Sequence, residues 1–126
     1  MKTVIVVPDV PPSMNAYKKK NWRTYVALKN GWALRTASAC CGKQRVQGPV
    51  VLTYTFHFGT RLHRDFDNYA ATTKWFTDAL KGRVIDEDDS TVVTELRIRF
   101  GHDPKNPRVE ITIESVEPPQ ETGGPV

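Results

Sequence analysis

Apolar and polar residues alternate most regularly over Val50–Phe58. A period of two residues is typical of a strand with one buried face, so this segment predicts a strand. The apolar positions on that face are Leu52, Tyr54, Phe56 and Phe58. Near the start of the chain, the β-branched run Thr3–Val7 ends at Pro8 and predicts a shorter strand.

Two more segments alternate in the second half of the chain, at 92–100 and 109–116. Segment 101–107 between them contains glycine, asparagine and two prolines, which favour turns. The pattern therefore predicts two strands joined as a hairpin.

Helical spacing replaces alternation in two places. Segment 25–41 has apolar residues three to four apart and is followed by Gly42, which predicts an amphipathic helix with a glycine at its end. Segment 67–81, followed by Gly82, predicts a second helix.

The second helix separates its charged and apolar residues. At about 100° per residue, one stripe of this helix carries Asp67, Ala71, Lys74 and Asp78, and the opposite stripe carries Tyr69, Phe76 and Leu80. Taken alone, the charged stripe is a solvated face with a Lys74–Asp78 pair worth a few tenths of a kcal/mol. However, acids continue beyond both ends of this helix, at Asp65 and in 86–89. This extension favours a functional site.

The loop 11–17 follows the first predicted strand. Pro12 forces Pro11 into an extended conformation, so the loop cannot begin as a helix. Cations interleaved with aromatic residues follow it, namely Lys18, Lys19, Lys20, Trp22 and Arg23. Tyr17 or Trp22 could stack on an unpaired base, although ordinary packing explains them at least as well.

Composition limits the architecture. A chain of 126 residues with 39% hydrophobic residues fits one domain with a single core, which we expect over 1–116, and the proline- and glycine-containing tail 117–126 is predicted to be disordered. No apolar run approaches the roughly 20 residues that span a bilayer, so we expect a cytoplasmic protein. The only cysteines, Cys40 and Cys41, are adjacent and predict neither a mutual disulfide nor a zinc site.

Charge is distributed unequally along the chain. Residues 1–64 carry eleven Lys and Arg against one acid, a net of +10, whereas 65–126 carry seven against thirteen, a net of −6. A basic half of this kind favours a nucleic-acid partner. The acidic half favours bound cations.

The acids could converge if 86–89 folds back beside the start of the second helix. Two like charges about 4 Å apart repel by about 4 kcal/mol at an effective dielectric near 20, so such crowding favours a bound cation. Oxygen ligands without His or Cys indicate Mg²⁺ or Mn²⁺ rather than Zn²⁺. An EF-hand is disfavoured, because Tyr69, Ala71 and Phe76 would occupy ligand positions after Asp65 and Asp67.

Four motifs in order resemble the RusA-type Holliday junction resolvases. They are Pro11-Pro12-Ser13-Met14-Asn15-Ala16-Tyr17, Arg64-Asp65-Phe66-Asp67-Asn68, Lys74 four residues before Asp78-Ala79-Leu80, and Asp88-Asp89 just before a strand. The resemblance implies a RusA-like α+β fold with a mixed sheet of about four strands and two main helices packed on it. It also implies a homodimeric, Mg²⁺-dependent endonuclease that cuts four-way DNA junctions symmetrically in DNA recombination and repair.

The resemblance also implies roles for individual residues. The metal-binding and catalytic acids fall on Asp65, Asp67 and Asp89, and the catalytic lysine falls on Lys74. Asp88 is the alternative to Asp89, because Thr91 stands where the family tends to carry Gln. Supporting residues are Asn68 and Asp78. Five residues separate Asn68 from Lys74 where the family often has two, a longer form expected among phage-type relatives, which would place the protein in the host cytoplasm.

The basic half supplies the candidate DNA contacts, Lys18, Lys19, Lys20, Arg23, Lys43, Arg45, Arg61 and Arg64. His57 and His63 are interpreted as structural or phosphate-facing, because neither is paired with a nucleophile. Two alternatives remain: a nuclease acting on other branched DNA such as flaps and forks, and a non-catalytic DNA-binding module of the same fold. A cation-binding adaptor would leave the basic half unexplained.

Overall fold

The computed structural model describes residues 1–18 and 21–116. Lys19, Lys20 and the tail 117–126 lie outside the described residues. In chain order the elements are β1 (Lys2–Pro8), α1 (Met14–Lys18), α2 (Trp22–Ala39), β2 (Val50–Phe58), α3 (Phe66–Ala70), α4 (Thr73–Leu80), β3 (Val93–His102) and β4 (Arg108–Ser115). All four strands and the first main helix occur close to their predicted positions.

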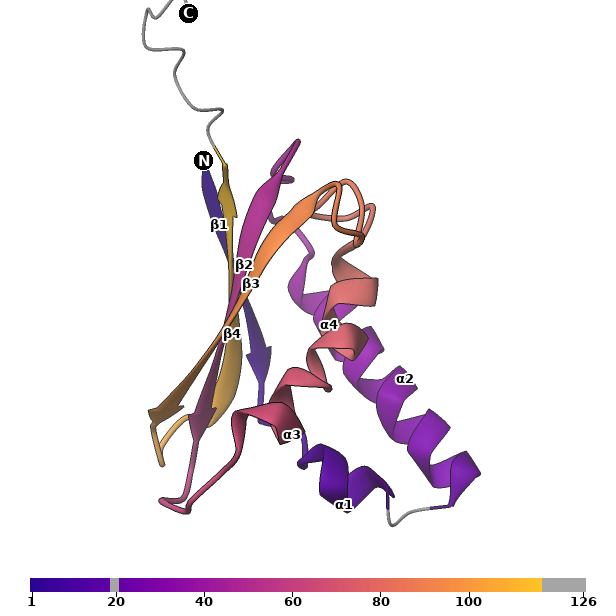
Figure 1. Cartoon of the computed structure of the whole chain (residues 1–126), viewed down its shortest axis with the longest axis vertical. Helices are drawn as coiled ribbons and strands as arrows, with labels where there is room; N and C mark the ends of the chain where they lie inside the picture. Colours follow the sequence, from indigo (N-terminus) through magenta and orange to yellow (C-terminus); the bar gives the residue numbers. More distant parts are fainter. Residues whose placement is uncertain (19–20, 117–126) are drawn as a thin grey trace, which may run out of the picture.

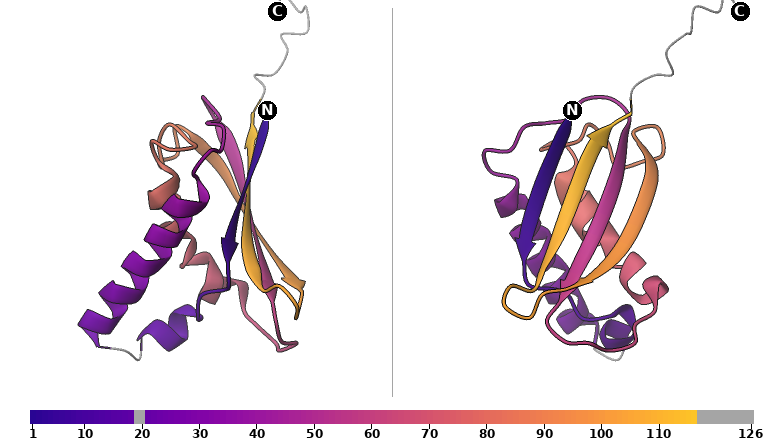
Figure 2. Two further views of the ribbon diagram at one scale, coloured as in Figure 1. Left: turned by 180° about the vertical axis from the view of Figure 1, so that it is seen from behind. Right: turned by 90° about the vertical axis from the view of Figure 1, so that its left-hand side faces the viewer.

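The four strands form one mixed sheet in the order β1-β4-β2-β3 (Figure 2). β4 pairs antiparallel with both β1 and β2, and β2 pairs parallel with β3. The predicted hairpin is therefore wrong, because β2 lies between β3 and β4. Crossing one strand requires about 9.6 Å, two inter-strand spacings, and the five residues 103–107 can span this distance.

The helices all cover the same face of the sheet, and the other face is open (Figures 1 and 2). The covered face carries the alternate apolar residues of the strands, and the predicted side chains of β2 are indeed buried. The largest fully buried side chains from the sheet are Ile5, Leu52, Tyr54, Phe56, Ile111 and Ile113. Burial of this apolar surface, at about 25 cal/mol per Å², is the main force that holds the helices on the sheet.

The loop 11–17 contains a short helix that the sequence pattern did not predict. Residues 11–13 are non-helical, as the two prolines require, and α1 begins at Met14. The Ser13 hydroxyl accepts a hydrogen bond from the Ala16 amide at 3.4 Å and so caps this helix. α1 contacts α3, which brings the first motif beside the second.

α2 begins earlier than its apolar spacing predicts. The Asn21 side chain accepts a hydrogen bond from the Thr24 amide at 2.8 Å and caps the helix at its start. Trp32 and Thr36 are its buried residues. The chain leaves the helix through Gly42, at φ 73°.

The second predicted helix is two helices, α3 and α4, which break at residues 71 and 72. Thr72 and Thr73 donate their hydroxyls to the carbonyls three residues back, of Tyr69 and Ala70, at 2.6 and 2.7 Å. Such local bonds compete with the regular helical pattern. The predicted facing survives the break: Tyr69, Phe76 and Leu80 are buried, whereas Asp67, Ala71, Lys74 and Asp78 are exposed.

Within the described ranges, no helix is both long and apolar enough to span a membrane.

Candidate active site

One arginine holds the loop between β2 and α3, residues 59–65. The Arg64 guanidinium donates hydrogen bonds to the Thr60 carbonyl at 3.1 Å, the Leu62 carbonyl at 3.4 Å and the Thr60 hydroxyl at 2.8 Å. The same group lies over the Phe58 ring, 3.8 Å from its centre. Arg64 therefore ties the loop to the end of β2 and fixes where α3 begins.

Asp65 and Asp67 follow directly from this loop. Asp65 lies at the N-cap of α3 in an extended conformation, but its side chain makes no capping hydrogen bond. Asp67 lies in the first turn of α3. Both residues are exposed, and within the described part of the chain neither carboxylate accepts a hydrogen bond. A carboxylate at this position usually caps its helix, so these two acids are available to an external ligand.

Asn15 and Asn68 join the two aspartates around one hollow of about 470 Å³. Asn15 comes from α1 and Asn68 from α3, so the hollow lies where the first two motifs meet. We call this set, Asp65 and Asp67 with Asn15 and Asn68, the α3 acidic site. All of its donors are oxygen or amide groups.

A second acidic group lies at the C-terminal half of α4. The Asp78 carboxyl lies beside the Asp88 carboxyl. The pKa of Asp78 is raised above its usual range, first by partial burial and then by the bond to Asp88. The charges of Lys74, one turn earlier, and Lys29 of α2 act in the opposite direction. We call Asp78 and Asp88 the α4 acidic pair.

The other acids of 86–89 have structural partners. Asp86 accepts bonds from the Arg45 Nε and the Gly48 amide, both at 2.8 Å, and the second of these is the larger cause that lowers its pKa. Glu87 pairs with Lys81 at 2.6 Å.

The Asp89 carboxylate also accepts its hydrogen bonds from within its own loop. It accepts hydrogen bonds from the Thr91 amide at 2.9 Å and from the Thr91 hydroxyl, and the latter bond is the first cause that lowers its pKa. The Asp89 carbonyl accepts bonds from the amides of Val92 and of Val93, the first residue of β3. Of the four acids in 86–89, Asp88 is thus the one that faces another acid.

The structure does not bring all the predicted acids together. Within residues 1–18 and 21–116, no three His, Cys, Asp or Glu side chains are close enough to hold one metal ion. Figure 1 shows the reason: α3 and the loop that follows α4 lie at opposite ends of this helical segment. The eleven residues from Asp67 to Asp78 would span roughly 16 Å in a straight helix, far beyond the ligand distances of about 2 Å around Mg²⁺. Among the described side chains, the acids of 86–89 therefore do not join Asp65 and Asp67 in one cluster, and the condition under which all the acids would converge is not met.

The α3 acidic site nevertheless has the donor chemistry that Mg²⁺ prefers. Magnesium is commonly held by one or two carboxylates and completes its shell with water and substrate phosphate. Asp65 and Asp67 are two such carboxylates, exposed and without protein partners in the described chain. The donor set fits a hard divalent cation and excludes a closed thiolate or imidazole site.

Lys74 is exposed on α4, and its positive charge acts against the burial that raises the pKa of Asp78. The longer spacing after Asn68 places it with the α4 acidic pair, four residues from Asp78, in the part of the chain between the two acidic groups.

The predicted DNA contacts differ in how free they are. Arg23, Lys43 and Arg61 are exposed. Arg45 is paired with Asp86, and Arg64 bonds to its own loop, so both side chains already have protein partners. Lys18 ends α1. Trp22 is 74% exposed and stacks on Tyr25 with ring centres 5.8 Å apart.

Three residues near these sites were not predicted. Asn15 stood in the first motif, but only the contact between α1 and α3 gives it a place beside Asp65. Lys29 has no sequence signal, because its partner Asp78 lies on another helix. His102 was assigned to a turn, whereas it is the last residue of β3.

Comparison with known families gives one match. The family model described as Endodeoxyribonuclease RusA matches residues 8–114, most of the chain, and the matched range includes both acidic groups and Lys74. Among curated proteins, no match is found.

Proposed function

Because the chain belongs to the RusA endodeoxyribonuclease family, we propose that it is a Mg²⁺-dependent nuclease that resolves four-way DNA junctions by paired, symmetric nicks. Family membership supports an endodeoxyribonuclease of the Holliday junction resolvase type. The metal, the paired nicks and the residue roles are our proposal. Its strongest support in the structure is the α3 acidic site, with two exposed aspartates that no described group of the protein neutralises.

Asp65 and Asp67 would hold Mg²⁺, for which Mn²⁺ could substitute, with Asn68 and Asn15 as hydrogen-bonding neighbours. When bound, the ion would supply a water of lowered pKa and stabilise the leaving 3′ oxygen. Arg64 keeps the two aspartates in place by fixing the loop before them. The expected products carry 5′-phosphate and 3′-hydroxyl ends.

Lys74 would offset the charge that develops on the phosphate during cutting, because it is exposed and lies between the two acidic groups in the chain. Asp88, which faces Asp78, is our candidate for the third acid of the family motif. We prefer it to Asp89, whose carboxylate already accepts two hydrogen bonds from Thr91. Whether one or two ions bind depends on whether this pair takes a cation of its own.

A four-way junction needs two coordinated nicks on opposing strands, so we propose that the protein acts as a homodimer with two-fold symmetry. Exposed cations of the basic half, such as Arg23, Lys43 and Arg61, would contact phosphates. We expect such an enzyme to work in the cytoplasm.

Cutting of a synthetic mobile junction by wild type and Asp67→Asn, with and without Mg²⁺, tests this proposal. Wild type should cut only with Mg²⁺, and Asp67→Asn should bind the junction without cutting it. Asp9→Asn is the matched control, since Asp9 is also an exposed aspartate and its positive φ of 73° is tolerated by Asn. If Asp67→Asn cuts at the wild-type rate, the site assignment is wrong.

Two alternatives are separated by the same assay. Comparable rates on flaps, forks and junctions would indicate a nuclease for branched DNA in general. Tight binding to junctions without Mg²⁺-dependent cutting of any branched DNA would indicate a non-catalytic module.

A further inference from the structure

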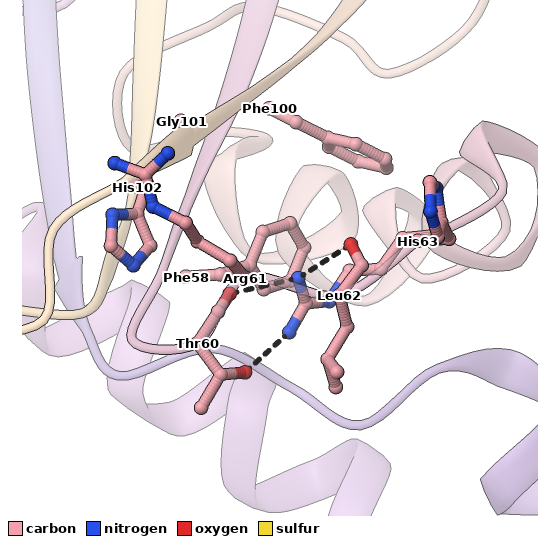
Figure 3. A pocket seen from close by; sticks show the side chains of 9 residues that line it. Phe58, Thr60, Arg61, Leu62, His63, Phe100, Gly101 and His102 are labelled. Atoms are coloured by element: carbon pink, nitrogen blue, oxygen red, sulfur yellow. Dashed lines mark hydrogen bonds between the residues drawn. The ribbon is translucent and has the colours of Figure 1, made fainter.

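A second hollow, of about 470 Å³, lies on the other side of Arg64 from the α3 acidic site. Its lining comes from two segments, the end of β2 with the following loop and the end of β3 (Figure 3). The lining residues are Phe58, Thr60, Arg61, Leu62, His63, Arg64, Phe100, Gly101 and His102. Four of these nine carry a basic side chain and none carries a carboxylate.

The basic groups of this hollow are free to bind. Figure 3 shows the Arg61 guanidinium and the His102 ring on one side of the hollow and the His63 ring on the other. Within the described ranges, the side chains of Arg61, His63 and His102 make no hydrogen bond or ion pair. Arg64 is occupied by the loop, but its partners are neutral, so its positive charge is not cancelled.

The shape of the hollow is fixed by packing. Phe58 and Phe100 form its apolar wall with ring centres 5.2 Å apart, and Phe66 stacks on Phe100 at 4.2 Å. Phe66 stands between Asp65 and Asp67 in the chain, so the wall of the hollow is joined directly to the two acids. A ligand held here would have a set position relative to the α3 acidic site.

These observations point to an anion. A hollow with two permanent cations, two histidines and no acid concentrates negative charge, and Arg forms charge-assisted hydrogen bonds with phosphate. We propose that Arg61 and His102 bind a backbone phosphate of the DNA strand, next to the phosphate that is cut at the α3 acidic site. This inference rests on the proposed nuclease function, which supplies the DNA strand.

The two hollows would then bind two different phosphates of one DNA strand. The α3 acidic site takes the phosphate that is cut through a cation, and the basic hollow takes a neighbouring phosphate through direct hydrogen bonds. Arg64 forms a common wall of both hollows, so the spacing between the two phosphates is set by one side chain. Arg61 and His102 would thereby align the strand for cutting.

A binding experiment with neutralised phosphates tests the pairing. Junctions that carry one uncharged methylphosphonate at a time, at successive positions around the cut, are bound to the Asp67→Asn protein by fluorescence anisotropy. Neutralising the proposed phosphate should weaken binding roughly ten- to a hundredfold, as expected for the loss of one charge-assisted bond. Adding Arg61→Ala should weaken binding to the unmodified junction by a similar factor and abolish the effect of that one methylphosphonate.

Two further variants separate contact from folding. Arg61→Lys should keep part of the effect, and His102→Gln should reduce it at the same phosphate. Arg35→Ala is the matched control, since this exposed arginine on α2 lines a different hollow with Val6 and Asp9. It should leave every methylphosphonate effect unchanged.

The outcome is independent of cutting. If the Arg61→Ala protein shows the same set of sensitive phosphates as its parent, or no phosphate is sensitive in either, the subsite proposal is wrong even when the wild-type enzyme cuts junctions. If the wild type cuts no branched DNA but the Arg61-dependent phosphate is found, the nuclease proposal fails and the phosphate site stands.

Discussion

The two acidic groups of this protein differ in the protein partners that their carboxylates already have. In the α3 acidic site, Asp65 and Asp67 are exposed and accept no hydrogen bond within the described chain. In the α4 acidic pair, Asp78 faces Asp88, partial burial and this neighbour raise the pKa of Asp78, and the charges of Lys74 and Lys29 oppose that rise. The α3 acids are therefore left for an external cation, whereas the α4 acids already face each other and cationic side chains.

The largest expected effect separates Asp88 from Asp89. We expect Asp88→Asn to lower the rate of junction cutting about 100-fold or more, as for the loss of one group that stabilises the transition state. Asp89→Asn should keep near wild-type cutting and lower the Tm, because the Thr91 amide and hydroxyl lose their acceptor. Single-turnover rates and thermal unfolding of both variants measure this. The reverse pattern would show that Asp89 is the third acid of the site.

Loosening the loop before α3 should have the next largest effect. Arg64→Lys keeps the charge but loses the fork that reaches Thr60 and Leu62 together. We expect the cutting rate to fall about tenfold, a loss of about 1.4 kcal/mol in transition-state stabilisation. Arg99→Lys, an exposed position on β3, serves as the control and should cut normally. Equal rates for both variants would show that Arg64 does not position the acids.

Magnesium should stabilise the α3 acidic site before any DNA is present. At ten times its dissociation constant, a ligand that binds only the folded state adds about 1.4 kcal/mol to the free energy of unfolding. We therefore expect the Tm of wild type and of Asp9→Asn to rise with Mg²⁺. The Tm of Asp67→Asn should rise much less. A rise that depends on Asp88 and not on Asp67 would move the principal metal site to the α4 acidic pair.

The smallest effect concerns Asp86, an acid with structural partners. Its pKa is lowered in the folded protein, first by the Gly48 amide and then by Arg45. Its contribution to stability is therefore present above its unfolded pKa of about 4 and is lost as the pH falls through the lower folded pKa. Asp86→Asn should have a lower Tm than wild type at neutral pH, and the gap should close in acid. A gap of the same size at every pH would mean that charge is not its cause.

The sequence predicted well where local patterns decide the structure. β2 occupies the predicted residues, and Phe76 and Leu80 are buried on the predicted side of their helix. These outcomes depend only on spacing along one element. The helix break at 71 and 72 was missed because Thr72 and Thr73 can also be accommodated in a regular helix, and the hydrogen bonds that they choose are not visible in a pattern of polarity.

Long-range arrangement could not be predicted in the same way. Alternation in 92–100 and 109–116 gives two strands but says nothing of β2 lying between them. The motifs gave Asp65, Asp67, Lys74 and Asp89 as candidates, with Asp88 as the alternative to Asp89. That choice depends on Arg45, Gly48, Lys81 and Thr91, whose partners are set by tertiary packing.

The strand order also sets the timing of folding. Among the described strands, β1 is joined to the sheet through β4, and their paired residues, such as Lys2 and Glu114, are a hundred or more positions apart. Contacts of such long sequence separation form slowly, because the chain must close a large loop first. On a ribosome, the first strand to emerge must therefore wait for the last. Until β4 arrives, the apolar side chains of β1 and one edge of β2 stay exposed to other chains, so slow synthesis at high temperature is the condition under which this fold should aggregate most.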